Sequence, residues 1–283
     1  MKILFCGDVV GKNGRDVVSK YLPKLKKHLD IDMVVLNGEN SAHGFGINPD
    51  IADLFFKNGV DVITLGNHSF DQQIIVEYIN NNTSKIIRPL NYKNDMAGSG
   101  FCVITLKNNL KVLVVNLMGT LFMGDRIALK NPFYEIENLL NTYVLGKNIN
   151  AIVVDFHAEA TSEKNAILHF LQGKVSMICG THSHIPTLDF RIKNGTAYQT
   201  DVGMCGNYDS VIGMNKEASL GRFLDLSKKL RLSPEDGDAT FCGIYVEIND
   251  STGLATYCYP VILGNLLHNF MPYSLKIKWE ESV

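Results

Sequence analysis

The sequence of 283 residues lacks any apolar run long enough to cross a membrane. A spanning helix needs about 18 or more consecutive apolar residues, so we expect no membrane insertion. The apolar N-terminal run from Met1 to Cys6 is too short before Gly7-Asp8 to be a signal peptide. We therefore expect a cytoplasmic protein.

Closely spaced cysteines and blocks of like charge are also missing. The six cysteines include no Cys-x-x-Cys pair, and Cys6, Cys102 and Cys179 lie inside apolar runs, which is typical of buried free thiols. The net charge is −2, and the densest basic stretch, residues 24–27, falls on a helical pattern and is expected to be a solvated face. Long nucleic acids are therefore not expected as partners.

Continuous apolar runs recur along the first two thirds of the chain. Such runs are typical of strands that are covered on both faces. They lie at residues 3–6, 33–36, 60–65, 112–117, 151–154 and 175–179. Helical patterns separate them; in the first, Leu22 and Leu25 share one face and Pro23 is expected to kink or restart the helix. This alternation predicts βαβ units.

After about residue 185 the pattern changes. Strand-like segments at 188–193, 196–200, 240–248 and 254–263 follow one another without long helices, and segment 205–239 is rich in loop-forming residues. We expect these late strands to complete a second sheet packed on the first. A chain of 283 residues is near the limit for one hydrophobic core. The prediction is one α/β domain over residues 1–283, with two sheets face to face and helices outside.

Polar segments follow several of these strands and contain four of the eight histidines. They are Gly7-Asp8, residues 37–40, 66–71, 155–157 and 180–184. The carboxyl ends of parallel strands meet at one edge of a sheet, and carboxylate, amide and imidazole groups gathered there are typical of a metal centre. In extended backbone, His182 and His184 would point to the same side. Asp8 alone would be read as a helix cap, so the joint pattern is what predicts metal binding.

In order along the chain, these segments resemble the five motifs of the calcineurin-like metallophosphoesterases. The first motif is usually Asp-x-His, but Val10 stands where that histidine belongs, and Glu39-Asn40 replaces the common aspartate of the second motif. This variant resembles the YmdB-type branch, which contains bacterial phosphodiesterases that act on cyclic nucleotides. The resemblance implies a four-layer α-β-β-α sandwich.

Carried over by position, the resemblance implies two transition-metal ions that share Glu39. The implied ligands of the first ion are Asp8, Glu39, Asn40 and His184. Those of the second ion are Glu39, Asn67, His157 and His182. Iron is the precedent in the branch, with manganese and zinc as alternatives.

The resemblance also implies hydrolysis by a hydroxide that bridges the two ions. His68 lies outside the implied ligand set, and it would protonate the leaving oxygen as general acid. Asp71 either orients His68 or caps the following helix, and the sequence favours the cap. The candidate substrate contacts are Lys12, Arg15, His43 and Phe45.

The sequence thus predicts a metal-dependent phosphoric diester hydrolase whose substrates are 2′,3′- or 3′,5′-cyclic nucleotides. A phosphomonoesterase or protein phosphatase on the same scaffold is one alternative. A metal-dependent nucleotide-binding regulator without catalysis is another, although the presence of His68, which no ligand role requires, argues against it. The physiological substrate, the metal, homo-oligomerisation and any regulatory role stay open.

Overall fold

The computed structural model describes residues 1–93, 96–123, 128–227 and 230–272. Within these ranges, no helix is long and apolar enough to cross a membrane. The six cysteines are free and buried, as the sequence predicts. A cytoplasmic location and a single domain over residues 1–283 stay predictions.

The first sheet contains the N-terminal strands and the last two strands of the chain. Its order is β14-β13-β1-β3-β4-β5. The four strands β1 (Lys2–Cys6), β3 (Met33–Asn37), β4 (Val62–Thr64) and β5 (Ile86–Ile87) are parallel. An antiparallel hairpin of β13 (Phe241–Ile248) and β14 (Ala255–Leu263) pairs with β1.

The second sheet has the order β10-β11-β9-β8-β7-β6. Its strands are β6 (Phe101–Thr105), β7 (Lys111–Met118), β8 (Ala151–His157), β9 (Met177–Thr181), β10 (Arg191–Lys193) and β11 (Thr196–Gln199). The four central strands are parallel and both edges are antiparallel. The late strands are therefore divided between the two sheets. We expected the late strands to complete the second sheet. This holds for β10 and β11 but is wrong for β13 and β14, because β13 pairs with β1.

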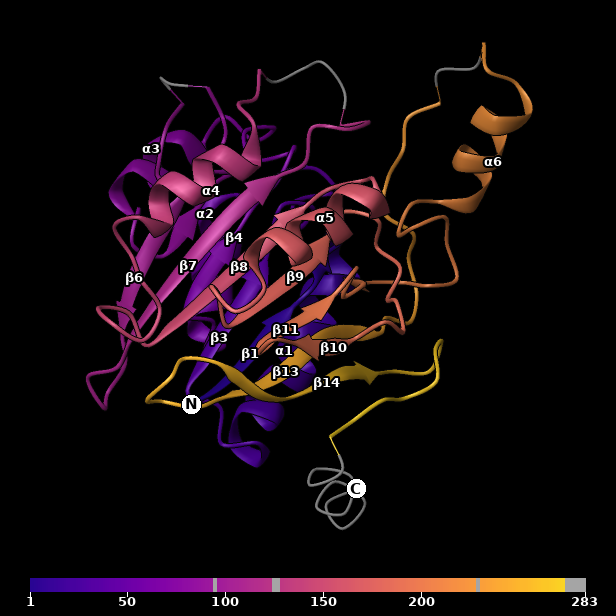
Figure 1. Cartoon of the computed structure of the whole chain (residues 1–283). Helices are drawn as coiled ribbons and strands as arrows, with labels where there is room; N and C mark the ends of the chain where they lie inside the picture. The colour runs from indigo at the N-terminus through magenta and orange to yellow at the C-terminus, as the bar shows by residue number, and fades with distance from the viewer. Residues whose placement is uncertain (94–95, 124–127, 228–229, 273–283) are drawn as a thin grey trace.

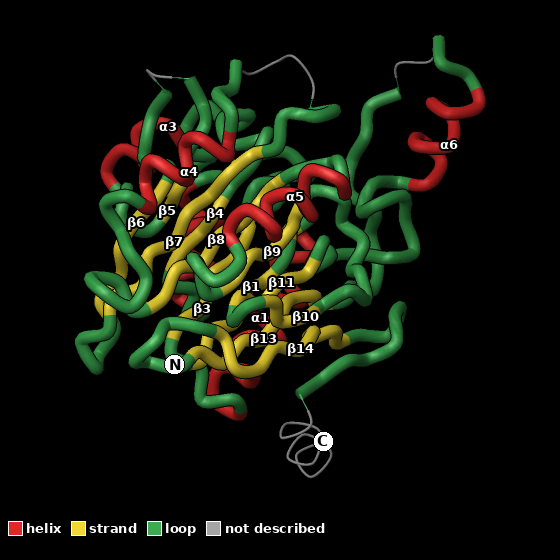
Figure 2. Tube along the Cα trace, viewed as in Figure 1, coloured by secondary structure: helices red, strands yellow, loops and turns green. Residues whose placement is uncertain are grey.

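Helices cover the outer face of each sheet (Figure 1). The first sheet packs on α1 (Gly11–His28), α2 (Pro49–Lys57) and α3 (Ile75–Asn81), and the second on α4 (Pro132–Leu140) and α5 (Thr161–Leu171). A short pair of parallel strands, β2 (Asp8–Val9) and β12 (Met204–Cys205), lies outside both sheets. Figure 2 shows α6 (Lys216–Leu224) standing apart from these layers, so segment 205–239 holds a helix as well as loops.

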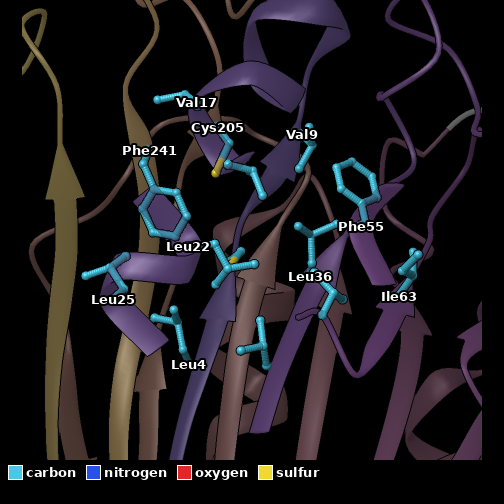
Figure 3. Packing of buried hydrophobic residues seen from close by; sticks show 14 of the residues in the cluster. Leu4, Val9, Val17, Leu22, Leu25, Leu36, Phe55, Ile63, Cys205 and Phe241 are labelled. Carbon is cyan, nitrogen blue, oxygen red and sulfur yellow. The ribbon is translucent and has the colours of Figure 1, made fainter. Parts of the chain in front are cut away.

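Three hydrophobic cores follow from the alternation of side chains along each strand. In β1, Ile3 and Phe5 belong to the core between the sheets, whereas Leu4 belongs to the core under the helices. Figure 3 shows Leu22 and Leu25 of α1 packed in this outer core. The helix continues through Pro23 without the restart that was one of the two expectations, and Leu22 and Leu25 on either side of it are fully buried. The predicted α-β-β-α layering is thus confirmed.

Candidate metal centre

The predicted ligand residues meet at one edge of the two sheets, where the parallel strands end. Asp8 lies in β2, and Glu39 and Asn40 follow β3. Asn67 follows β4, His157 is the last residue of β8, and the two remaining histidines, His182 and His184, follow β9. The structure therefore brings all seven residues to the same region from five separate parts of the chain.

Three atoms that can donate a lone pair converge on Nε2 of His157. Its Nε2 lies 3.0 Å from Glu39 Oε1, 3.0 Å from Asn67 Oδ1 and 3.1 Å from His182 Nδ1. The ligand atoms of Glu39, His157 and His182 all lie within 4.8 Å of one another. One proton on His157 cannot satisfy three acceptors, so this donor set fits a metal cation.

His184, Asn40 and Asp8 form a second group of lone-pair donors beside the first. His184 Nδ1 lies 2.8 Å from the carbonyl oxygen of Ile212 and must donate to it, so its Nε2 carries a lone pair when the ring is neutral. That Nε2 lies 3.3 Å from Asn40 Oδ1, which is also an acceptor. Asp8 is fully buried, and its Oδ1 has no hydrogen-bond partner within the described ranges. A buried carboxylate oxygen without a donor is costly unless a cation is bound there.

A chain of buried hydrogen bonds sets the orientation of His157. Its Nδ1 lies 2.9 Å from Thr181 Oγ1, and Thr181 donates its only hydroxyl proton to Asp155 Oδ1 at 2.7 Å. His157 Nδ1 must therefore donate, which directs Nε2 toward the ligand cluster. The other oxygen of Asp155 accepts from Thr64 at 2.5 Å and Asn37 at 3.0 Å. Asp155 thus ties three strand ends to one ligand.

The electrostatic field of the cluster favours positive charge. Burial alone would lower the pKa of His157, but Glu39 and Asp8 raise it to about 9. Burial would likewise raise the pKa of Glu39, yet His157 and the neighbouring histidines hold it below its usual range. The carboxylates that attract a proton to His157 would also attract a metal ion, and metal binding would release that proton.

His182 and His184 reach the site in a way that the sequence reasoning did not foresee. Strand β9 ends at Thr181, and both histidines have left-handed backbone, with φ of 93° and 64°. Our argument from extended backbone was therefore wrong, although both side chains do lie at the cluster. Such backbone is uncommon in residues other than glycine and needs support from its surroundings.

Asp201 and Lys164 supply this support. Asp201 Oδ2 accepts from the backbone nitrogen and the hydroxyl of Ser183, at 3.1 and 2.8 Å. Lys164 Nζ lies 2.8 Å from the same oxygen, and both charged side chains are buried. Removing either partner would leave an uncompensated buried charge. Sequence reasoning missed this pair, because a lysine in α5 and an aspartate after β11 carry no local signal of their meeting.

Gly66 is required by the close approach of two ligands. A Cβ atom at this position would collide with Glu39 Oε2 and with the ring of His157. A glycine just after β4 therefore lets the backbone lie against the cluster.

His68 lies beside the cluster and contributes its backbone, not its ring. Its N–H donates to Glu39 Oε2 at 3.0 Å, while its Nδ1 lies 2.7 Å from Asp71 Oδ2. The ring is partly exposed and packs edge-on against Phe45, with 5.1 Å between centroids. Helix α3 begins only at Ile75 and has no side-chain cap, so our expectation that Asp71 caps this helix was wrong. Asp71 orients His68 instead.

A cavity of about 720 Å³ is lined in part by Phe45, whose ring packs against His68. Two of the predicted substrate contacts, His43 and Phe45, line it. The other two do not: Lys12 pairs with Asp16 at 2.7 Å, and Arg15 donates to the backbone oxygen of Ser41. Arg15 thereby supports the loop that carries Asn40.

Comparison with known proteins identifies the family and relatives of this chain by sequence. A family model described as YmdB-like protein matches residues 4–261. A 2′,3′-cyclic-nucleotide 2′-phosphodiesterase of Bacillus subtilis is 38% identical over 266 residues, which cover 94% of this chain and 98% of that protein.

Solved structures agree with these sequence matches. A crystal structure described as a novel phosphatase of Mycoplasma pneumoniae is 32% identical, with a TM-score of 0.87 over 100% of this chain and 99% of the other. The calcineurin-like phosphoesterase YfkN of Bacillus subtilis has a TM-score of 0.56 over 100% of this chain and 96% of that one. At 11% identity, YfkN supports the fold alone.

Proposed function

Because this chain belongs to the YmdB-like protein family, we propose that it hydrolyses 2′,3′-cyclic nucleotides with the help of two metal ions. It is an enzyme of the metal-dependent phosphoric diester hydrolase class. The convergence of Glu39, Asn67 and His182 on His157 is the observation that carries the proposal. A ring of lone-pair donors at the ends of parallel strands is suited to phosphoryl chemistry at bound cations.

The proposed ligands form two groups that share Glu39. Asp8, Asn40 and His184 would complete one group, as the unpartnered Asp8 oxygen and the facing acceptors of Asn40 and His184 suggest. Asn67, His157 and His182 would complete the other. When bound, the ions would supply Lewis-acid stabilisation of the phosphoryl oxygens and activation of a water molecule. Mixed oxygen and nitrogen ligands suit iron or manganese, with zinc as the alternative.

His68 and Asp71 provide the proton for the leaving oxygen. Asp71 accepts a hydrogen bond from Nδ1 of His68 at 2.7 Å, which fixes the orientation of the ring and directs Nε2 away from Asp71. The proton on Nε2 is then available to the 2′ oxygen as its bond to phosphorus breaks. The alkoxide is a poor leaving group, so this transfer lowers the barrier. The product is a nucleoside 3′-phosphate.

A substrate panel on one metal-analysed preparation tests this function. We expect kcat/KM to be at least tenfold higher for a 2′,3′-cyclic nucleotide than for the matching 3′,5′-cyclic nucleotide or 3′-monophosphate. The released nucleotide should be the 3′-phosphate by chromatography, and activity should rise with metal content. Faster hydrolysis of monoesters would favour the phosphatase alternative and contradict the proposal.

A further inference from the structure

We propose that the cavity lined by Phe45 binds a second phosphate group, so that the preferred substrate is a 2′,3′-cyclic nucleotide that also carries a 5′-phosphate. This inference rests on the proposed function and narrows its substrate class. We call this cavity the arginine pocket. It is lined by Ala42, His43, Phe45, Gln72, Arg222, Arg231, Leu232, Ser233 and Pro234.

The arginine pocket has basic side chains and no carboxylate in its lining. Arg222, Arg231 and His43 are the polar residues in it that can carry positive charge. Across the described ranges, neither Arg222 nor Arg231 has an ion-pair partner, whereas Arg191 pairs with Asp189 at 3.0 Å. Arg222 Nε donates to the backbone oxygen of Leu230 at 2.8 Å, which leaves its two terminal nitrogens available. Guanidinium groups of this kind bind phosphate through paired hydrogen bonds.

The position of the pocket suits the far end of a nucleotide whose cyclic phosphate lies at the metal centre. Phe45 forms part of the pocket wall and also contacts the ring of His68. Gln72 Nε2 donates to the backbone oxygen of Phe45 at 2.8 Å and fixes this boundary. Phe45, Leu232 and Pro234 provide apolar surface for the sugar or base. A volume of about 720 Å³ lies within the usual range for small-molecule sites.

The segment that carries the arginines is held against the site. Arg222 lies on α6, which Figure 1 shows beyond the sheets. The start of α6 is tied to the returning chain, because Asn215 N donates to Ser233 O at 2.8 Å and Lys216 N donates to Glu235 Oε2 at 2.8 Å. Arg231 and Arg222 thus face one pocket from the two arms of this loop.

A comparison of two substrates tests the inference in the full-length, metal-loaded enzyme. We expect kcat/KM to be about tenfold higher for uridine 2′,3′-cyclic phosphate with a 5′-phosphate than without it. The factor is modest because both arginines are exposed and salt screens their charge. The preference should shrink as the salt concentration rises.

Variants assign the preference to the pocket. Arg231→Ala and Arg222→Ala should each lower the ratio of the two kcat/KM values severalfold, and Arg231→Glu should bring it to one or below. Lys216→Ala is the matched control, because it removes a positive charge from the same helix outside the pocket. Its ratio should equal that of wild type. A dinucleotide that ends in a 2′,3′-cyclic phosphate distinguishes the two molecules that could supply the second phosphate. Preference for the dinucleotide would identify RNA ends as the substrate, and preference for the 5′-monoester would identify free nucleotides.

The outcomes distinguish this inference from the function on which it rests. Turnover of both uridine substrates with equal kcat/KM would overturn the phosphate pocket and leave the proposed function intact. Turnover of neither, with two metals bound, would overturn the proposed function itself. A preference that survives in both arginine variants would place the second phosphate elsewhere and contradict the inference.

Discussion

Replacing His68 with alanine is expected to lower kcat on 2′,3′-cyclic nucleotides by about 10²- to 10⁴-fold while both metals stay bound. The backbone N–H of residue 68, which donates to Glu39, is kept in this variant. The lost ring contacts Asp71 and Phe45, not the ligand cluster. The variant should therefore lose activity and keep its metal content. Steady-state kinetics and elemental analysis on the same sample would measure both.

The leaving group provides the control for this prediction. An aryl phosphodiester needs little protonation on departure, so His68→Ala should slow its hydrolysis much less. The alkaline limb of the kcat profile, which reports loss of the proton from the acid, should also disappear. Asp71→Asn should show a smaller loss of the same kind, because it weakens the hydrogen bond that orients the ring of His68. Equal losses on both substrates would assign His68 to substrate positioning, and loss of metal would place it among the ligands.

Glu39→Gln is expected to reduce metal binding at both sites and to abolish detectable turnover. Glu39 is almost fully buried, and one of its oxygens contacts His157 while the other accepts from the backbone of His68. The amide keeps the shape of the side chain but removes the charge that offsets two cations. Loss of a partner outside the ligand set typically costs 10- to 100-fold in metal affinity. Loss of the shared carboxylate should exceed that range, as metal titration would measure.

His184→Ala is the matched comparison for Glu39→Gln. His184 contacts Asn40 and the backbone of Ile212, away from the contacts that join His157 to Asn67 and His182. It should therefore lose one ion and keep the other. If both variants lose the same number of ions, Glu39 is not shared between two sites.

The sequence predicts the strands and the position of the site well, for a clear physical reason. Runs such as 151–154 are apolar without alternation because both faces of the sheet are covered. Such strands can therefore be recognised in a single sequence. Parallel strands then place their polar carboxyl ends together. Asp8, Glu39 and His157 can be grouped on this basis from the sequence alone.

Features that depend on distant contacts could not be predicted in this way. The left-handed backbone of His182 is supported by the pair formed by Lys164 and Asp201, which are 37 positions apart. Asp71 precedes a helix in the sequence and therefore looks like its cap, but the turn before α3 brings it to His68. Pairing of β13 with β1 joins the two ends of the chain, and neither strand carries a mark of its partner.

The most direct measurement of the central claim is anomalous scattering from crystals of the enzyme loaded with iron or manganese. The account predicts two peaks per chain, with Glu39 contacting both. One peak should lie against His184 and the other against His157 and His182. A single peak, or two peaks of which one lies outside this set of residues, would contradict the two-metal centre.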